Sequence, residues 1–476
     1  MAVGKLLRGK MGRNHTLPGA DLYLEALEKL PDIMSLRRKG VIAIEILGMM
    51  AFYLQCADLR DDAYVHAGMA LRIAMANGMA DESSYQAFIR SEQNHRRRLW
   101  WTIYMQERRL AAATGQPLTI QDAHITTKLP TESPGFVAPA AMRINIKLAN
   151  ITGKIMDAIY GSQNKVVHHY VGIVKGILNQ LLDVANCIPK EYSLNLAKES
   201  PISRTAGTLY LMLYQCVVLA TRPTLLHLAR NRLDTRPSER EGLVSTSELE
   251  HIANACIEAA SRSIDVLEAL KEQHLIANFG FFDLDAAYSA AFVFVLVDSV
   301  AINTTQPCGV SKIRTAFNIV KHLSVQGNKA AAKRSAEIEQ TCNHLGISFH
   351  EEPEENVQGP RSVLSGLEDI AQLSRGNGDS GTERTQEGDM HQGEPALPDS
   401  NLSTTHFDWT QAAATLFDCS ASGSRGAQQS MAAALSFAEG GNEMFNSVWL
   451  DDFSLTGVVE TDWAELDKQL TSQSRV

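Results

Sequence analysis

Apolar residues recur at spacings of three and four along most of residues 21–345, and no convincing run alternates between apolar and polar residues. Such a spacing places apolar side chains on one face of a helix, whereas a half-buried strand needs alternation. We therefore expect an all-α, multi-helix domain over residues 21–345. The helices are expected at Val41–Cys56, Arg60–Gly78, Ile144–Tyr160, Val166–Val184, Thr205–Ala220, Leu249–Leu270, Asp283–Ala301 and Ile313–Leu345.

Several residues mark where these helices should begin and end. Ser83 with Gln86 is a capping-box pattern that predicts the start of a helical region. Pro223 should kink or end the helix that precedes it, because proline has no backbone N–H. The most apolar stretch, Ala286–Val297, has 12 residues, and a membrane span needs about 20. We expect a buried helix there and no membrane-spanning segment.

Charge divides the chain into two parts. Residues 1–350 carry 38 Lys and Arg against 32 Asp and Glu, a net of +6, and residues 351–476 carry 6 against 22, a net of −16. A basic segment at residues 1–20 precedes the helical domain. Residues 346–400 are acidic and rich in Gly, Ser and Pro, which predicts a disordered linker.

Residues 401–476 combine acids with aromatic residues, which disordered tails usually lack. Between Glu443 and Asp467 there are seven acids and no base. Repulsion between carboxylates keeps such a chain open, so its aromatic side chains remain available to a partner groove. This pattern predicts an acidic activation segment, and the alternatives are a helix docked on the body or a tail without function. Its expected anchors are Phe445, Trp449, Phe453 and Trp463.

The most informative stretch is residues 95–130, HRRRLWWTIYMQERRLAAATGQPLTIQDAHITTKLP. Its first part has helical spacing, with Trp100 beside the apolar face and Trp101 in line with Arg97 and Arg108. We expect Trp100 to be buried and the two arginines to cover the Trp101 ring. Gly115 should end this helix in a left-handed cap, and Pro117 prevents continuation.

This stretch resembles the middle regulatory domain of fungal binuclear zinc-cluster transcription factors, also called the xylanolytic transcriptional activator regulatory domain. The matching residues are Arg96, Arg97, Arg98, Leu99, Trp100, Trp101, Tyr104, Arg108, Gly115, Pro117, Ile120, Asp122, Ile125, Leu129 and Pro130. Glu107, Gln116 and His124 replace an Asp, an Arg and an Asp of the family pattern. If those charges pair in the family, their network is weakened or rearranged here. Weaker resemblance extends over about residues 20–345.

The resemblance implies a nuclear regulator of RNA polymerase II transcription and not an enzyme. Its helical domain would control activity and its tail would recruit transcriptional coactivators. The resemblance also allows a homodimer. The family reads DNA through six N-terminal cysteines that hold two zinc ions, but the first cysteine here is Cys56 and no CxxC occurs. We therefore expect no zinc or other cofactor on this chain. DNA is a partner only if a zinc cluster lies upstream, and the alternative is a helical interaction cofactor or scaffold without DNA binding.

Other signals favour structure over chemistry. The Gly-Asp-Ser-Gly within Asn377–Thr382 lacks the flanking strands of a serine-protease site. His168–His169, and Cys342 with His344, offer two ligands each, too few for a closed tetrahedral metal site. Asp61–Asp62 has no second acidic cluster with which to hold magnesium. The basic runs Arg96–Arg98 and Arg37–Lys39 could serve nuclear import or phosphate contact, but we expect solvated helix faces.

Overall fold

The computed structural model describes residues 1–8, 17–161, 167–194, 196, 201–233, 246–299, 310–345 and 347. These residues form helices and connecting turns, with no strand among them, as the apolar spacing predicted. The α-helices are α1 (Ala2–Arg8), α2 (Ala20–Glu28), α3 (Ile33–Arg37), α4 (Val41–Cys56), α5 (Arg60–Ala76), α6 (Arg90–Thr114), α7 (Ala140–Ile155), α8 (Val167–Asn186), α9 (Arg204–Leu233), α10 (Thr246–Glu272), α11 (Phe281–Ser299), α12 (Val310–Val325) and α13 (Lys329–His344). Short 3₁₀ turns occur at Glu82–Ala87, Asp122–His124 and Lys190–Tyr192, and a π turn at Met156–Tyr160 extends α7.

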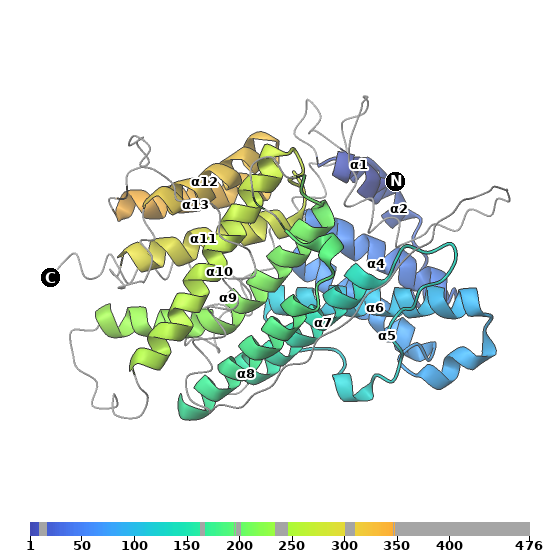
Figure 1. Ribbon diagram of the computed structural model, residues 1–476. Coiled ribbons are helices and arrows are strands. Elements are labelled where there is room, and N and C mark those ends of the chain that lie inside the picture. The colour runs from blue at the N-terminus through green and yellow to red at the C-terminus, as the bar shows by residue number, and fades with distance from the viewer. Residues whose placement is uncertain are drawn as a thin grey trace, which may run out of the picture.

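The N-terminal half packs α4, α5 and α6 against one another (Figure 1). Small residues of α5, among them Ala63, Ala67 and Ala70, have no exposed surface, so neighbouring helices approach closely there. Gly115 ends α6 with φ at 68°, which is the predicted left-handed cap. The capping box at Ser83 is wrong. Asp81 is the capping residue instead, and it precedes a 3₁₀ turn.

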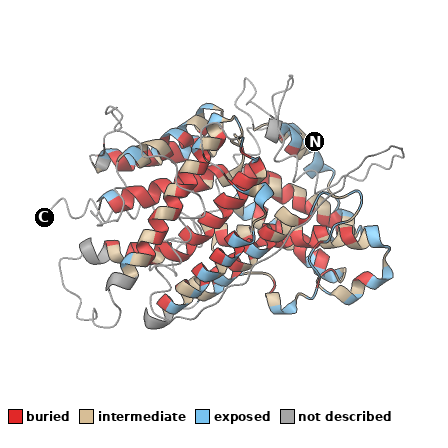
Figure 2. Ribbon diagram, viewed as in Figure 1, coloured by how far each residue is buried: buried red, intermediate tan, exposed pale blue. Residues whose placement is uncertain are grey.

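The C-terminal half is built on α11, which is buried from Asp283 to Val297 (Figure 2). Helices α9, α10, α12 and α13 pack around it (Figure 1). The expected helical region Ile313–Leu345 is divided in two, because Gly327 adopts φ of 98° and Asn328 caps α13. The Asn328 side chain accepts a hydrogen bond from the backbone N–H of Ala331, 3.0 Å away.

We expected Pro223 to kink or end the preceding helix. Helix α9 continues through Pro223, so an end at this residue is wrong. A proline inside a helix leaves the carbonyl four residues earlier without its N–H partner. Here the Tyr160 hydroxyl donates to that carbonyl, Leu219 O, at 2.8 Å. A side chain from the π turn after α7 therefore replaces the missing bond.

Helix α7 lies between the two halves and contributes to both cores. Ile144, Leu148 and Ile151 belong to the core of the C-terminal half. Ile146 and Ala149 belong to the core of the N-terminal half. Because one helix supplies both cores, a shift of one half is transmitted to the other through α7.

Among the described helices, one segment of α9, Arg204–Ala229, has the length and apolar composition that could cross a membrane. However, 89% of its most apolar 18-residue stretch is buried inside the fold. Its apolar surface is therefore used in packing against the other helices. The stretch Ala286–Val297 is a buried helix, as predicted.

Candidate functional site

Helix α6 places the motif residues on its different faces. Leu99 and Trp100 are buried in the core of the N-terminal half, with Trp100 showing no exposed surface. Trp101 is also buried, and its ring packs edge-on against Tyr104 with centroids 5.2 Å apart. The helix is therefore enclosed on more sides than an amphipathic helix with one apolar stripe.

The arginine run that opens the motif is not a solvated face, contrary to expectation. Arg98 is buried and donates to Val137 O at 2.6 Å. Arg96 and Arg97 are half-buried and pair with Glu92 at 2.8 Å and Glu82 at 2.5 Å, respectively. Each guanidinium also lies over an aromatic ring: Arg96 over Phe88, Arg97 over Tyr85 and Arg98 over Phe136. The expected cover of Trp101 by Arg97 and Arg108 is replaced by these pairings, since Arg108 lies over Tyr104. Arg37–Lys39 is exposed.

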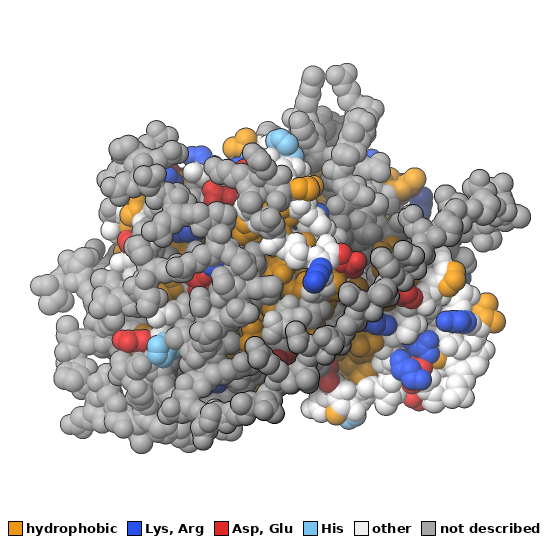
Figure 3. All heavy atoms as spheres, in the orientation of Figure 1, with side chains coloured by type: hydrophobic (Ala, Val, Ile, Leu, Met, Phe, Trp, Pro, Cys, Tyr) orange, Lys and Arg blue, Asp and Glu red, His pale blue; other side chains and the backbone are white. Residues whose placement is uncertain are grey.

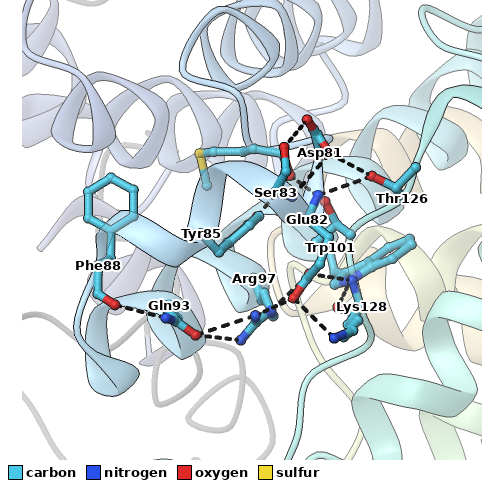
Figure 4. Close-up of polar contacts among 12 residues, drawn as sticks. Asp81, Glu82, Ser83, Tyr85, Phe88, Gln93, Arg97, Trp101, Thr126 and Lys128 are labelled. Atoms are coloured by element: carbon cyan, nitrogen blue, oxygen red, sulfur yellow. Dashed lines mark hydrogen bonds and ion pairs between the residues drawn. The ribbon is translucent and has the colours of Figure 1, made fainter.

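Residues 116–130, here called the motif strap, run back along α6 in the opposite direction. Arg108 donates to Ile120 O at 2.6 Å near the end of α6. Closer to the start of the helix, the Trp101 Nε1 donates to Lys128 O at 3.0 Å. Trp101 thus anchors the strap through its polar edge, a role that its position in the sequence did not indicate (Figure 4).

Glu82 holds the strap to both the 3₁₀ turn and α6 (Figure 4). One carboxylate oxygen accepts from Arg97 Nη2 at 2.5 Å, and the other accepts from the Lys128 backbone N–H at 2.9 Å. Although burial opposes ionisation, the hydrogen bonds from Arg97 and Lys128 hold the pKa of Glu82 below its usual range. Sequence reasoning missed Glu82 because it lies outside the motif.

Threonines of the strap complete this attachment. Thr126 donates its hydroxyl to Asp81 at 3.0 Å and its backbone N–H to Ala80 O at 2.9 Å. Thr127 donates to Met79 O at 2.6 Å. The turn at 79–82 and strap residues 126–128 are therefore joined along their length.

A second polar cluster fixes the other end of the strap. Arg108 is fully buried between Glu107 at 3.1 Å and Asp122 at 2.9 Å. Asp122 also accepts from the Tyr104 hydroxyl and from Asn150, each at 2.7 Å. Burial raises the pKa of Tyr104 to about 12, so this hydroxyl stays protonated and donates.

Of the three residues that differ from the family pattern, Glu107 lies in this cluster, whereas Gln116 and His124 lie at the surface. Glu107 is fully buried and accepts from the Thr119 backbone N–H at 2.6 Å, so the substitution of Asp by Glu preserves an ion pair. Gln116 and His124 are exposed. The charge network is thus rearranged around Glu107, Arg108 and Asp122.

The remaining motif residues shape the strap. Pro117 is exposed, and its carbonyl accepts from the Tyr64 hydroxyl at 3.0 Å. Leu129 is 38% exposed, whereas Pro130 is buried and its carbonyl accepts from Arg143 at 2.7 Å. The strap is therefore bonded to α5 near its start and to α7 at its end.

A cavity of about 420 Å³ opens between α6, the strap, α7 and α8. Motif residues Trp101, Tyr104, Asp122 and Leu129 form one side of it. The other side is formed by residues of α7 and α8, among them Lys147, Asn150, Gln180 and Asp183, and by Cys187 just after α8. Aromatic and apolar walls with a few polar groups are typical of a small-molecule or peptide site.

The described residues do not fit a zinc cluster. They contain no group of three or more His, Cys, Asp or Glu side chains that could hold a metal. Cys56, Cys216, Cys256 and Cys342 are buried and free, and burial raises the pKa of Cys216 and of Cys256 to about 11. A zinc ligand must be a thiolate, so these thiols are poor ligands.

Other candidate groups fall partly beyond the described side chains. The structure does not describe the side chains of His168, His169 and His344. Also outside the described residues are the Gly-Asp-Ser-Gly sequence, the linker and the four expected anchors, Phe445, Trp449, Phe453 and Trp463. Asp61 and Asp62 lie in the first turn of α5. The motif strap with its cavity is therefore the candidate site that the structure describes.

Comparison with known proteins shows what part of this domain is similar to. Residues 23–216, from α2 to the middle of α9, match the fungal specific transcription factor domain. This stretch of the chain is therefore similar to that domain. The match includes α6, the strap and every residue that lines the 420 Å³ cavity.

Curated relatives are transcription regulators of fungi. An uncharacterized transcriptional regulatory protein of Schizosaccharomyces pombe is 28% identical over 69% of this chain and 40% of its own length. The thiamine repressible genes regulatory protein thi1 of the same organism is 22% identical over 58% of this chain and 35% of its own length. Activator of stress genes 1 of Saccharomyces cerevisiae is 26% identical over 44% of this chain and 23% of its own length.

These relatives support a role for this chain in the regulation of transcription. The chain spans 40% or less of the length of the three relatives named above. No solved structure matches the chain.

Proposed function

We propose that this chain regulates RNA polymerase II transcription in the nucleus, with the fungal specific transcription factor domain controlling the activity of an acidic coactivator-binding tail. The domain match and the named relatives support regulation of transcription. The acidic and aromatic composition of residues 401–476 supports the role of the tail.

The observation that carries the proposal for the domain is the direction of the motif arginines. Arg97, Arg98 and Arg108 donate to Glu82, Val137 O and Asp122 within the protein. Guanidinium groups already paired with protein acceptors are poorly placed to neutralise DNA phosphates. On the face drawn in Figure 3, the described basic side chains near α5 and α6 lie among acidic and hydrophobic ones. We therefore propose that the motif arginines hold the motif strap in place, and that the position of the strap controls the activity of the tail.

A substitution at Glu82 tests control by the strap. Glu82→Gln removes the charge that holds Arg97 and Lys128 together, so the strap should loosen and reporter activity of the full chain, tethered to an unrelated DNA-binding domain, should change at least threefold. The matched control is Glu92→Gln, which removes a more exposed partner of Arg96 and should leave activity unchanged. Equal activity of the Glu82→Gln chain and the parent, at equal protein level, would contradict control by the strap.

The tail is tested apart from the domain. Fused to an unrelated DNA-binding domain, residues 401–476 should activate the reporter, because aromatic anchors can order on a coactivator groove and a few buried rings dominate such contacts. Replacing Trp449 and Phe453 together by Ala should abolish most of this activity. Replacing Asp451 and Asp452 by Asn should reduce it only in part, since acids mainly speed the encounter with basic partners.

The outcomes of the fusion experiment separate an activation role of the tail from a docked helix. A silent fusion, or a double aromatic variant as active as its parent, would overturn the activation role and favour a docked helix. The alternative function is a helical cofactor or scaffold without its own DNA binding. Retention of the untethered chain at promoters only when a second factor is present would support that alternative.

A further inference from the structure

A second, smaller cavity lies at the seam between the two halves of the domain. It has a volume of about 100 Å³ and is lined by residues of α4, α5, α6, α7, α9 and α11. Its polar lining includes Arg60, Arg109, Asn145, Gln215, Asp285 and Ser289. Neither the motif strap nor the 420 Å³ cavity shares a residue with this lining.

The unusual residue of this cavity is Arg109, on α6. Its Nη2 donates to the Asn145 side-chain oxygen and lies 3.8 Å from the Met212 sulfur, and its guanidinium lies over the Phe282 ring at 5.1 Å. Among the residues that the structure describes, no carboxylate pairs with Arg109. Its Nη1 and Nε groups also have no acceptor within that set. The Arg109 side chain is half-buried, so it keeps only part of its hydration and receives no counter-charge from a described carboxylate.

The other charges on the cavity wall balance one another. Arg60 pairs with Asp285 at 2.6 Å and with Asp58 at 3.0 Å. Arg334, on α13, pairs with the same two carboxylates at 2.8 and 2.9 Å. Two positive and two negative groups therefore cancel, and the charge of Arg109 remains uncompensated.

Other buried arginines of the fold show what Arg109 lacks. Arg204 forms two parallel hydrogen bonds to Asp283, at 2.9 and 2.8 Å. Arg108 lies between Glu107 and Asp122. Burial lowers the pKa of Arg109 to about 10, so it still carries its charge at neutral pH. Among the described residues, Arg109 therefore has no carboxylate to balance this charge.

We propose that the seam cavity is a binding site for a small anion, a carboxylate or an inorganic oxyanion, with Arg109 as its charged partner. The planar fork of an arginine suits two parallel hydrogen bonds to such an anion. The volume admits a carboxylate group or a phosphate-sized ion and excludes a large cofactor. Asn145 and Gln215 supply polar groups at the wall.

Occupancy of this cavity would join the two halves of the domain. Arg109 belongs to α6 of the N-terminal half, and Gln215 and Ser289 belong to α9 and α11 of the C-terminal half. An anion that contacts both sides binds the folded arrangement and not the unfolded chain, so it stabilises the fold by mass action. The inference does not depend on the role of the chain in transcription.

Thermal unfolding of the full 476-residue chain tests the site. The chain is titrated with sodium acetate or sodium phosphate, and sodium chloride at equal ionic strength serves as the reference. At ten times the dissociation constant of the bound anion, the midpoint temperature should rise by about 2 °C above the chloride reference. A rise with acetate alone identifies a carboxylate site, and a rise with phosphate alone identifies an oxyanion site.

Three variants assign the effect to Arg109. Arg109→Gln removes a half-buried charge that has no described carboxylate partner, so it should fold without anion and lose the anion-dependent rise. Asn145→Asp places a carboxylate on the atom that already accepts from Arg109, so it should raise the midpoint without anion and also lose the rise. Arg38→Gln removes an exposed charge and should keep the full rise.

Two results would overturn the proposal. One is a midpoint of the parent chain that neither acetate nor phosphate raises above the chloride reference. The other is an equal rise in the parent and in Arg109→Gln. If Arg109→Gln fails to fold, Asn145→Asp gives the same decision, since an undiminished rise in that variant also excludes the site.

Discussion

Removal of the Trp100 ring should lower the stability of the domain more than any other single change in the motif helix. The ring is fully buried in the core cluster that contains Leu47, Leu71 and Ile103. Truncation of a fully buried aromatic residue costs about 3–5 kcal/mol, through lost transfer free energy and the cavity that remains. With an m value of about 3 kcal/mol/M, the urea midpoint of Trp100→Ala should fall by about 1–1.7 M.

Two further substitutions separate the causes of this loss. The indole N–H of Trp100 has no acceptor among the described residues, and an unsatisfied buried donor itself costs about 1–3 kcal/mol. Trp100→Phe removes that donor and keeps most of the apolar volume, so we expect a loss of only about 1 kcal/mol. Trp101→Ala should cost about 2–3 kcal/mol, because the space it leaves joins the 420 Å³ cavity and can fill with water.

The assay is urea unfolding of the full chain followed by far-ultraviolet circular dichroism, with the parent and the three variants measured side by side. We expect the highest urea midpoint for the parent, followed in falling order by Trp100→Phe, Trp101→Ala and Trp100→Ala. Equal midpoints for Trp100→Ala and the parent would refute the closed burial of this ring. A Trp100→Phe variant as unstable as Trp100→Ala would refute the argument from the unsatisfied N–H.

Three other predictions follow from the contacts of the motif strap and the burial of the cysteines. Asp122→Asn weakens the ion pair between Asp122 of the strap and the buried Arg108, so it should lower the free energy of unfolding in urea by about 2 kcal/mol. A substitution at the exposed His124 is the control and should leave that free energy unchanged. Equal losses from both changes would contradict the ion pair. The pKa of Glu82 is held below its ordinary value of 4.5, so its contribution to stability is present above that pH and is lost as pH falls through the folded-state pKa. The difference in unfolding free energy between the parent and Glu82→Gln should therefore shrink between about pH 6 and pH 3.5, and a constant difference would count against the ion pair. Cys187 is exposed and should react with a maleimide before the buried Cys56, Cys216, Cys256 and Cys342, as peptide mapping would reveal; faster labelling of any of those four would contradict their burial.

Local patterns in the sequence determined the class of fold and most of its helices. The apolar spacing located α4 to the residue and α5 to within two residues. The cap at Gly115 followed from the freedom of glycine to adopt positive φ and from Pro117 just beyond it. The motif at residues 95–130 indicated the family whose domain residues 23–216 match. These features depend on residues a few positions apart, which is why a single sequence reveals them.

The tertiary structure decided which side chains meet. Glu82 became the anchor of the strap because Arg97 and Lys128 approach it from 15 and 46 residues away. The continuation of α9 through Pro223 required a hydroxyl from a residue 59 positions from Leu219. No local spacing encodes such partners, because the hydrogen bond forms only after distant helices have packed.

The same reasoning applies to charge. In the sequence Arg108 and Arg109 are adjacent arginines of equal appearance, yet in the fold one lies between two carboxylates and the other lines a cavity without any described carboxylate partner. The difference arises because neighbouring residues on a helix point about 100° apart and so enter different surroundings. The sequence by itself determined that both residues are charged and helical, and only the packing of α7, α9 and α11 around α6 decided which of them received its counter-charge from the protein.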